Sequence, residues 1–160
     1  MLVRAMTESD WPQVSRIFAM SIETGLYTFH TFCPDWESWD RVHHKVCRLV
    51  AVDEGQIVGW TALTPISPRP VFNGVAEVSI YVDLEHRRQG IGREMMNCLI
   101  KTSQEAGFWT LQSTIFKDNE ASLQLHLGCG FRVVGYRERY ARNKFGRWQD
   151  TWLVEHRASL

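Results

Sequence analysis

The stretch "EHRRQGIGREMM" (residues 85–96) decides how this chain is interpreted, because it lies where a strand-like segment meets a helical one. The preceding segment, "VAEVSIYVD" (residues 75–83), is rich in Val, Ile and Tyr and predicts a strand. Beyond the stretch, apolar residues recur at helical spacing: Ile91, Met95, Leu99 and Ile100. Gly107 offers a helix stop. A strand is therefore expected to lead into a helix through a turn with glycines and two arginines.

A helix that begins in this way attracts anions. The N–H groups of its first turn lack intrahelical partners and carry partial positive charge, and glycine lets a ligand approach them. Arg87 and Arg88 would add charge-assisted hydrogen bonds. A P-loop is excluded because no lysine and hydroxyl pair follows Gly90, and a dinucleotide fingerprint because Met95 replaces its third glycine. Spacing alone leaves open an ordinary turn with two solvated arginines.

The rest of the chain alternates between predicted strands and helices, which is typical of an α/β fold. Strands are expected at residues 2–6, in a hairpin over 48–66, and at 75–83, 108–116, 131–141 and 147–157. Helices are expected at residues 10–21, 36–46, 91–106 and 119–130. An aromatic loop (25–36) and a proline-rich loop (65–74) connect them. We expect one domain over residues 1–160.

The overall composition disfavours several classes of protein. Hydrophobic residues make up 44% and charged residues 22%, which is typical of a globular protein. Eighteen basic residues balance eighteen acidic ones, so no nucleic-acid partner is expected. No run of eighteen apolar residues occurs, and acidic residues come too early for a signal peptide. A cytoplasmic protein without membrane contact is predicted.

Cysteine and histidine spacing predicts no metal site. The four cysteines lie far apart without a C-x-x-C pair, so reduced, mostly buried thiols are expected. His43 and His44 are adjacent and would point to different sides of the predicted helix.

Three motifs together resemble those of a known family. "RRQGIG" resembles the acyl-CoA-binding motif R/Q-x-x-G-x-G/A of the GNAT superfamily of N-acetyltransferases, with Arg87, Gly90 and Gly92 at its fixed positions. "DNEASLQLHLGCGF" is similar to the family's second signature, and "KFGRWQDTWLVE" resembles the C-terminal strand of its phosphinothricin and methionine sulfoximine acetyltransferase branch. These matches follow the expected order over nearly the whole chain.

The resemblance implies the GNAT acyl-CoA N-acyltransferase fold, a strongly twisted mixed sheet flanked by helices, with acetyl-CoA in a V-shaped gap. The pyrophosphate would lie on backbone amides from Arg88 to Arg93, and the pantetheine arm would pair with Ile80 and Val82. The implied coenzyme-binding residues are Ile80, Val82, Arg87, Arg88, Gln89, Gly90, Ile91, Gly92, Arg93, Asn119 and Ser122. Asn119 is equally well explained as a helix N-cap.

Acetyl transfer to an amine needs a base for the amine and a proton for the departing thiolate. Glu77 is the single carboxylate inside the apolar predicted strand, before its last residue Asp83. It matches the branch's general base, acting through water, although an edge ion pair is the alternative. His126 matches a branch pattern and is a candidate acid or substrate contact, although a lone helix histidine is more often structural. Tyr136 and Tyr140 are further candidates for the proton donor.

For the acceptor, a free amino acid presents a carboxylate that a bidentate arginine suits. Arg69 is the candidate, with a solvated loop arginine as the alternative. Phe29, Tyr27 and Trp148 are expected to form the walls of the side-chain pocket or, equally, part of the core.

The resulting hypothesis is an N-acetyltransferase that moves the acetyl group of acetyl-CoA to the α-amino group of a small amino acid or analogue. The amine would attack directly, through a tetrahedral intermediate. Transfer to a protein N-terminus, lysine or polyamine is the alternative, and a noncatalytic acyl-CoA sensor is a remote one. The branch and the seven tryptophans also favour a homodimer.

Overall fold

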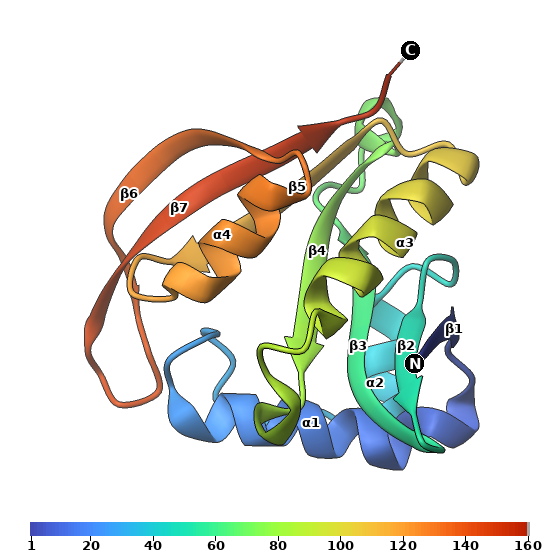
Figure 1. The fold of residues 1–160 in the computed structure, drawn as a ribbon. Helices are drawn as coiled ribbons and strands as arrows, with labels where there is room; N and C mark the ends of the chain where they lie inside the picture. The colour runs from blue at the N-terminus through green and yellow to red at the C-terminus, as the bar shows by residue number, and fades with distance from the viewer. Residues whose placement is uncertain (160) are drawn as a thin grey trace.

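A seven-stranded mixed sheet organises residues 1–159, the part of the chain that the computed structural model describes (Figure 1). The strand order is β1-β2-β3-β4-β5-β7-β6. The strands are β1 (Leu2–Ala5), β2 (Leu49–Asp53), β3 (Gln56–Pro65), β4 (Val75–Val82), β5 (Thr110–Phe116), β6 (Arg132–Arg142) and β7 (Trp148–Arg157). The β4–β5 pair is parallel and every other neighbouring pair is antiparallel. The predicted mixed α/β sheet is confirmed.

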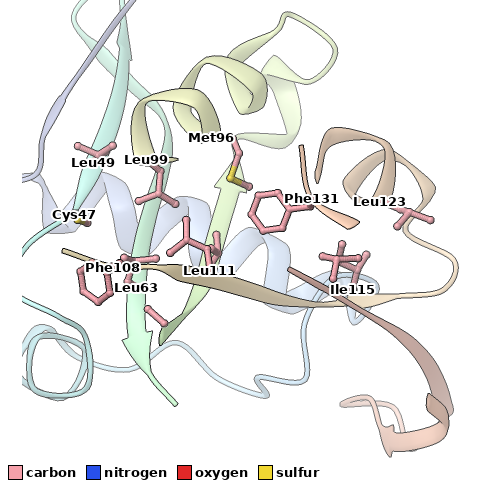
Figure 2. Close-up of a cluster of buried hydrophobic side chains, with 13 residues drawn as sticks. Cys47, Leu49, Leu63, Met96, Leu99, Phe108, Leu111, Ile115, Leu123 and Phe131 are labelled. Atoms are coloured by element: carbon pink, nitrogen blue, oxygen red, sulfur yellow. The ribbon is translucent and has the colours of Figure 1, made fainter. Parts of the chain in front are cut away.

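Helices cover both faces of this sheet. They are α1 (Trp11–Thr24), α2 (Trp36–Val42), α3 (Ile91–Glu105) and α4 (Glu120–Gly128). Apolar side chains of α1 and α2 pack with Val50, Ile57 and Ala62 on one face. On the other face, Met96 and Leu99 of α3 and Leu123 of α4 pack near Leu111 and Ile115 of β5, as Figure 2 shows. The helical spacing of Ile91, Met95 and Leu99 therefore predicted residues of the buried face of α3.

The second helix is shorter than predicted, so the expectation of helix over residues 36–46 is wrong at its C-terminal end. Contacts with other segments explain the early stop. The Arg48 guanidinium donates to the Asp40 carbonyl, which a longer helix would pair with the His44 amide. That amide donates to the Leu63 carbonyl of β3 instead, at 2.8 Å. Arg48 donates to the carbonyl groups of Asp40 (3.0 Å), His43 (3.2 Å) and His44 (2.7 Å). His43 instead stacks on Trp39 with ring centroids 4.0 Å apart.

Four of the seven tryptophans belong to the core against α1 and α2. Trp39 and Trp60 are fully buried, and Trp11 and Trp36 pack beside them. The abundance of tryptophan is thus largely explained within one chain, so it does not argue for an interface as the sequence analysis assumed.

The pairing between β4 and β5 ends after three residues. Val75, Ala76 and Glu77 pair with Thr110, Leu111 and Gln112, and no later pair follows among the described residues. Beyond this point the two strands separate, with α3 over β4 and α4 over β5 (Figure 1). The split leaves strand edges unpaired in the middle of the sheet, and this opening positions the site.

Candidate active site

A cleft of about 700 Å³ opens where β4 and β5 separate. Both strands line it, together with the turn before α3, the start of α4, the loop after α1 and Tyr140 of β6. Apart from Gln89, Arg69, Tyr136 and Trp148, every residue that the sequence analysis proposed for catalysis or binding lines this cleft. Residues that are distant in sequence thus share one cavity.

One end of the cleft is an anion-binding turn. Arg88 and Gly90 both adopt left-handed backbone conformations, with φ of 64° and 78°. Helix α3 then begins at Ile91 without a side-chain cap, and its first turn leaves amide groups without intrahelical acceptors. Arg87 and Arg93 line the cleft beside these amides. The turn therefore offers N–H groups and positive charge to an anionic ligand.

The loop after α1 reaches this turn through Tyr27. The Arg87 guanidinium donates to the Tyr27 hydroxyl at 2.7 Å and lies 4.5 Å from the centre of its ring. Tyr27 was predicted to form part of the side-chain pocket of the acceptor. It lines the cleft and also joins the aromatic loop to the anion-binding turn, a contact between residues 60 positions apart that spacing does not reveal.

Glu77 lies at the point where the β4–β5 pairing ends, in register with Gln112. Its carboxylate is half-buried and accepts a long hydrogen bond of 3.4 Å from the Thr114 hydroxyl. Burial raises the pKa of Glu77, while hydrogen bonds from Thr114 and Gln112 and the charge of Arg137 act in the opposite direction. A carboxylate with a raised pKa in a cleft is suited to accept a proton.

Aromatic side chains surround the part of the cleft near Glu77. Phe29 packs on Phe116 with ring centroids 4.5 Å apart and approaches Tyr140 at 6.0 Å. Tyr81 stacks on Trp60 at 5.0 Å, and burial raises the pKa of Tyr81 to about 12. Sequence reasoning missed Tyr81, although strand alternation puts it on the same face of β4 as Glu77.

His126 lines the cleft but is 1% exposed. Its Nδ1 lies 2.7 Å from the Ser122 carbonyl, which can only accept, so Nδ1 carries a proton. Burial lowers the pKa of His126, which favours the neutral ring, and Nε2 has no partner within residues 1–159. A neutral ring with this tautomer can accept a hydrogen bond at Nε2 but has no proton there to donate, so the geometry does not support His126 as the acid.

The two alternative tyrosines differ in position. Tyr136 lies outside the cleft, and its hydroxyl donates to Asp150, a hydrogen bond that raises the pKa of Tyr136 to about 12. Tyr140 lines the cleft and is 49% exposed. Of the candidate proton donors, Tyr140 is therefore the one with access to the cavity.

Asn119 and Ser122 combine a structural and a site position. The Asn119 side chain accepts a hydrogen bond of 3.2 Å from the Ser122 amide and so caps α4. Both residues also line the cleft. The two interpretations of Asn119 are thus compatible, because the cap lies at the cleft wall.

Besides Tyr136, three proposed residues lie outside the cleft. Arg69 is exposed in the loop before β4, near the end where β4 and β5 still pair, and its guanidinium lies over Phe72 at 5.8 Å. Trp148 is 54% exposed and packs under Arg142. Gln89 is exposed in the anion-binding turn without lining the cleft. Arg69 and Trp148 were predicted to contact the acceptor, but within a single chain neither of them lines the cavity.

The described residues contain no group of three or more His, Cys, Asp or Glu side chains that could hold a metal ion. Over residues 1–159, no helix is both long and apolar enough to cross a membrane. All four cysteines are free, and burial raises the pKa of Cys47 to about 11. Cys47 is the buried one, while Cys33, Cys98 and Cys129 are partly exposed, so the thiols are less buried than expected.

Comparison with known sequences gives several matches. The chain is 32% identical to a phosphinothricin N-acetyltransferase from Alcaligenes faecalis, over 96% of this chain and 80% of the other. It is 33% identical to an L-methionine sulfoximine/L-methionine sulfone acetyltransferase from Pseudomonas aeruginosa, over 67% of this chain and 62% of the other.

Solved structures share the fold. A ribosomal-protein-alanine N-acetyltransferase from Brucella melitensis has a TM-score of 0.89 and 31% identity, covering 99% of this chain and 100% of the other. A phosphinothricin acetyltransferase from Sinorhizobium meliloti, in complex with acetyl-CoA, also has a TM-score of 0.89, at 23% identity, covering 99% of this chain and 88% of the other.

A profile of the Acetyltransferase (GNAT) family matches residues 10–131, which include the anion-binding turn, Glu77 and α4. This match spans well over half of the chain. Together with the split sheet and the uncapped start of α3, it leads to one conclusion. The chain belongs to the GNAT family of acetyltransferases.

Proposed function

We propose that this protein transfers the acetyl group of acetyl-CoA to the α-amino group of a small amino acid or analogue. The observation that carries the proposal is that Glu77 and the free amides of α3 lie in one cleft at the split between β4 and β5. The names of the relatives support the acceptor class, since phosphinothricin and methionine sulfone are amino acid analogues. The presence of Glu77 speaks against a noncatalytic sensor.

The residues present fit acetyl-CoA. The amides from Arg88 to Arg93 and the guanidinium groups beside them would hold its pyrophosphate. Ile80 and Val82 belong to β4 beyond its pairing with β5, so backbone groups there are available to the pantetheine arm. When bound, acetyl-CoA supplies a thioester carbonyl as the electrophile.

Glu77 accepts the proton of the attacking amine, directly or through water, and its half-buried position favours this because the raised pKa increases its basicity. The departing thiolate needs a proton, and Tyr140 is our candidate because it lines the cleft. His126 contributes an acceptor at the wall of the cleft, since its Nδ1 proton is used by the Ser122 carbonyl.

We infer that Arg137, and not Arg69, binds the carboxylate of the acceptor. Arg137 pairs with Thr151, which in turn pairs with Phe116, so its side chain lies on the same face of the sheet as Thr114 and Glu77. Its guanidinium stacks on Tyr140 at 4.6 Å, and its charge lowers the pKa of Glu77. Arg137 does not line the cleft itself, but it lies on Tyr140, which does. Within residues 1–159 it forms no ion pair, so it is available to a ligand bound beside Tyr140.

An acceptor panel tests the proposal. The panel contains phosphinothricin, methionine sulfoximine, methionine sulfone and standard amino acids. It compares them with the matching amines that lack a carboxylate, with peptides that have an N-terminal alanine, and with polyamines. Thiol release from acetyl-CoA is the measurement. We expect kcat/KM at least about tenfold higher for an amino acid than for its decarboxylated amine. A peptide as the best acceptor would favour the alternative function, which the name of the Brucella melitensis enzyme suggests.

Two arginine variants serve as controls in the same panel. Arg137→Gln is expected to remove the preference for a carboxylate, while Arg69→Gln leaves it intact. The opposite result would return the carboxylate to Arg69.

Substitution of Glu77 tests the base. Glu77→Gln is expected to lower kcat about 100-fold at neutral pH and to leave the Kd of acetyl-CoA unchanged. The wild-type rate falls as pH decreases through the raised pKa of Glu77, because protonation removes the base, and the variant lacks this limb. At high pH the amine is already neutral, so the difference in kcat between Glu77→Gln and the wild type becomes smaller. A pH profile of kcat for both proteins is the measurement, and unchanged turnover would remove Glu77 from the mechanism.

Substitution of Gly90 tests the anion-binding turn. Gly90 has φ of 78°, which strains a β-branched residue, so Gly90→Val is expected to weaken acetyl-CoA binding about tenfold or more. Isothermal titration calorimetry measures the Kd. Gly128→Ala is the matched control, because a Cβ at Gly128 meets no other atom within 4 Å. Equal affinity of Gly90→Val and wild type would contradict the pyrophosphate assignment.

We also propose a homodimer. Strand β6 is an edge of the sheet, and the β6–β7 hairpin exposes the apolar side chains of Val133, Val134 and Trp148. Sedimentation equilibrium is expected to give twice the chain mass of 18.6 kDa. A monomer at micromolar concentration would contradict the proposal.

We further propose that the protein is located in the cytoplasm. The four free cysteines suit a reducing compartment, because paired thiols are typical of oxidising ones. Fractionation of cells that express the tagged chain tests the location, and recovery with membranes or in the medium would contradict it.

A further inference from the structure

The tip of the β6–β7 hairpin is tied to the end of α1 by one buried side chain. Asn143 is 7% exposed, and its Nδ2 donates to the Gly25 carbonyl at 3.2 Å. Its Oδ1 accepts from the amides of Phe145 (2.9 Å) and Arg147 (3.0 Å). The same side-chain amide therefore shapes the hairpin turn with its oxygen and holds a second element with its nitrogen.

Gly25 fits this contact closely. It has φ of 67°, and a Cβ at this position would lie 2.6 Å from the Phe145 ring. The ring thus rests against bare backbone, although Phe145 itself remains 61% exposed. Two independent contacts, one polar and one apolar, join the hairpin tip to the same residue.

The segment that follows Gly25 forms one wall of the cleft. Residues Leu26 to Asp35 contain no helix or strand, so side-chain contacts determine where this segment lies. Tyr27 reaches Arg87 in the anion-binding turn, and Phe29 packs on Phe116 near Glu77. The segment therefore touches both the anion end and the aromatic end of the cleft.

We infer that Asn143 is a positioning residue of the active site. By holding the Gly25 carbonyl, it fixes the start of the segment Leu26–His30 and with it the placement of Tyr27 and Phe29. The inference rests on the proposed acetyl transfer in this cleft. It assigns a role in acceptor binding to the tip of the hairpin (residues 143–147), none of which lines the cavity.

The variant Asn143→Asp separates this role from the shape of the turn. Aspartate keeps the acceptor oxygen for the Phe145 and Arg147 amides, which also favour the ionised form. It removes the donor to Gly25 and sets a carboxylate against its carbonyl oxygen. Hydrogen–deuterium exchange in residues 26–30 is expected to rise. The acceptor KM is expected to increase about tenfold, as for the loss of one buried hydrogen bond, with kcat changed less than KM.

A second variant tests the same inference in case Asn143→Asp fails to fold. Phe145→Ala removes an exposed ring that packs on Gly25 and lies 5.7 Å from the ammonium group of its neighbour Lys144. Because the ring is exposed, the fold should persist. We expect a smaller change in the same direction, in both exchange and acceptor KM. Glu138→Gln, on the same hairpin and exposed to solvent, is the matched control and should behave as wild type.

Two results would overturn the inference. One is unchanged exchange in residues 26–30 in folded Asn143→Asp and Phe145→Ala. The other is an unchanged acceptor KM in both variants. If the wild type acetylates no amine, the proposed function fails instead, and the exchange measurement still tests the contact between Asn143 and the loop.

Discussion

The early end of the β4–β5 pairing is the constraint on which the rest of the molecule depends. Three residue pairs join β4 to β5. Beyond Glu77 the two strands no longer pair with each other, and β4 continues beside β3 while β5 continues beside β7. Helix α3 covers β4 and α4 covers β5, so each strand keeps its own apolar support after the split (Figure 1). Unpaired backbone groups in the middle of a sheet are costly unless water or a ligand satisfies them. The split therefore opens a cleft and also exposes backbone groups with which a ligand can form hydrogen bonds in place of water.

Each wall of the cleft contributes a different chemical property. The start of α3 contributes amides and arginines for an anion, and β4 contributes a carboxylate with a raised pKa. The loop after α1 contributes aromatic surface and the contact between Tyr27 and Arg87. Because these parts come from separate elements, their relative placement depends on packing between them, including the contact of Asn143 with Gly25.

Local signals predicted the elements around the anion-binding turn well. The strand at residues 75–82 and the glycine-opened helix are encoded by neighbouring residues, and the structure has both within one or two positions. Prediction failed where position depends on long-range contact. Arg69 was assigned to the acceptor from the loop before β4 and Trp148 from the terminal hairpin, but the sequence does not say which end of β4 lies at the cleft. Likewise, Asn143 and Gly25 are separated by 118 positions, and no spacing rule connects them.

The most direct test of this account is a crystal structure with coenzyme A and an amino acid acceptor. We expect the pyrophosphate against the amides at the start of α3, the thiol between β4 and β5, and the acceptor amine within hydrogen-bond reach of Glu77 or of a water bound to it. A pyrophosphate bound elsewhere, or a β4–β5 pairing that continues past Glu77 and closes the cleft, would contradict it.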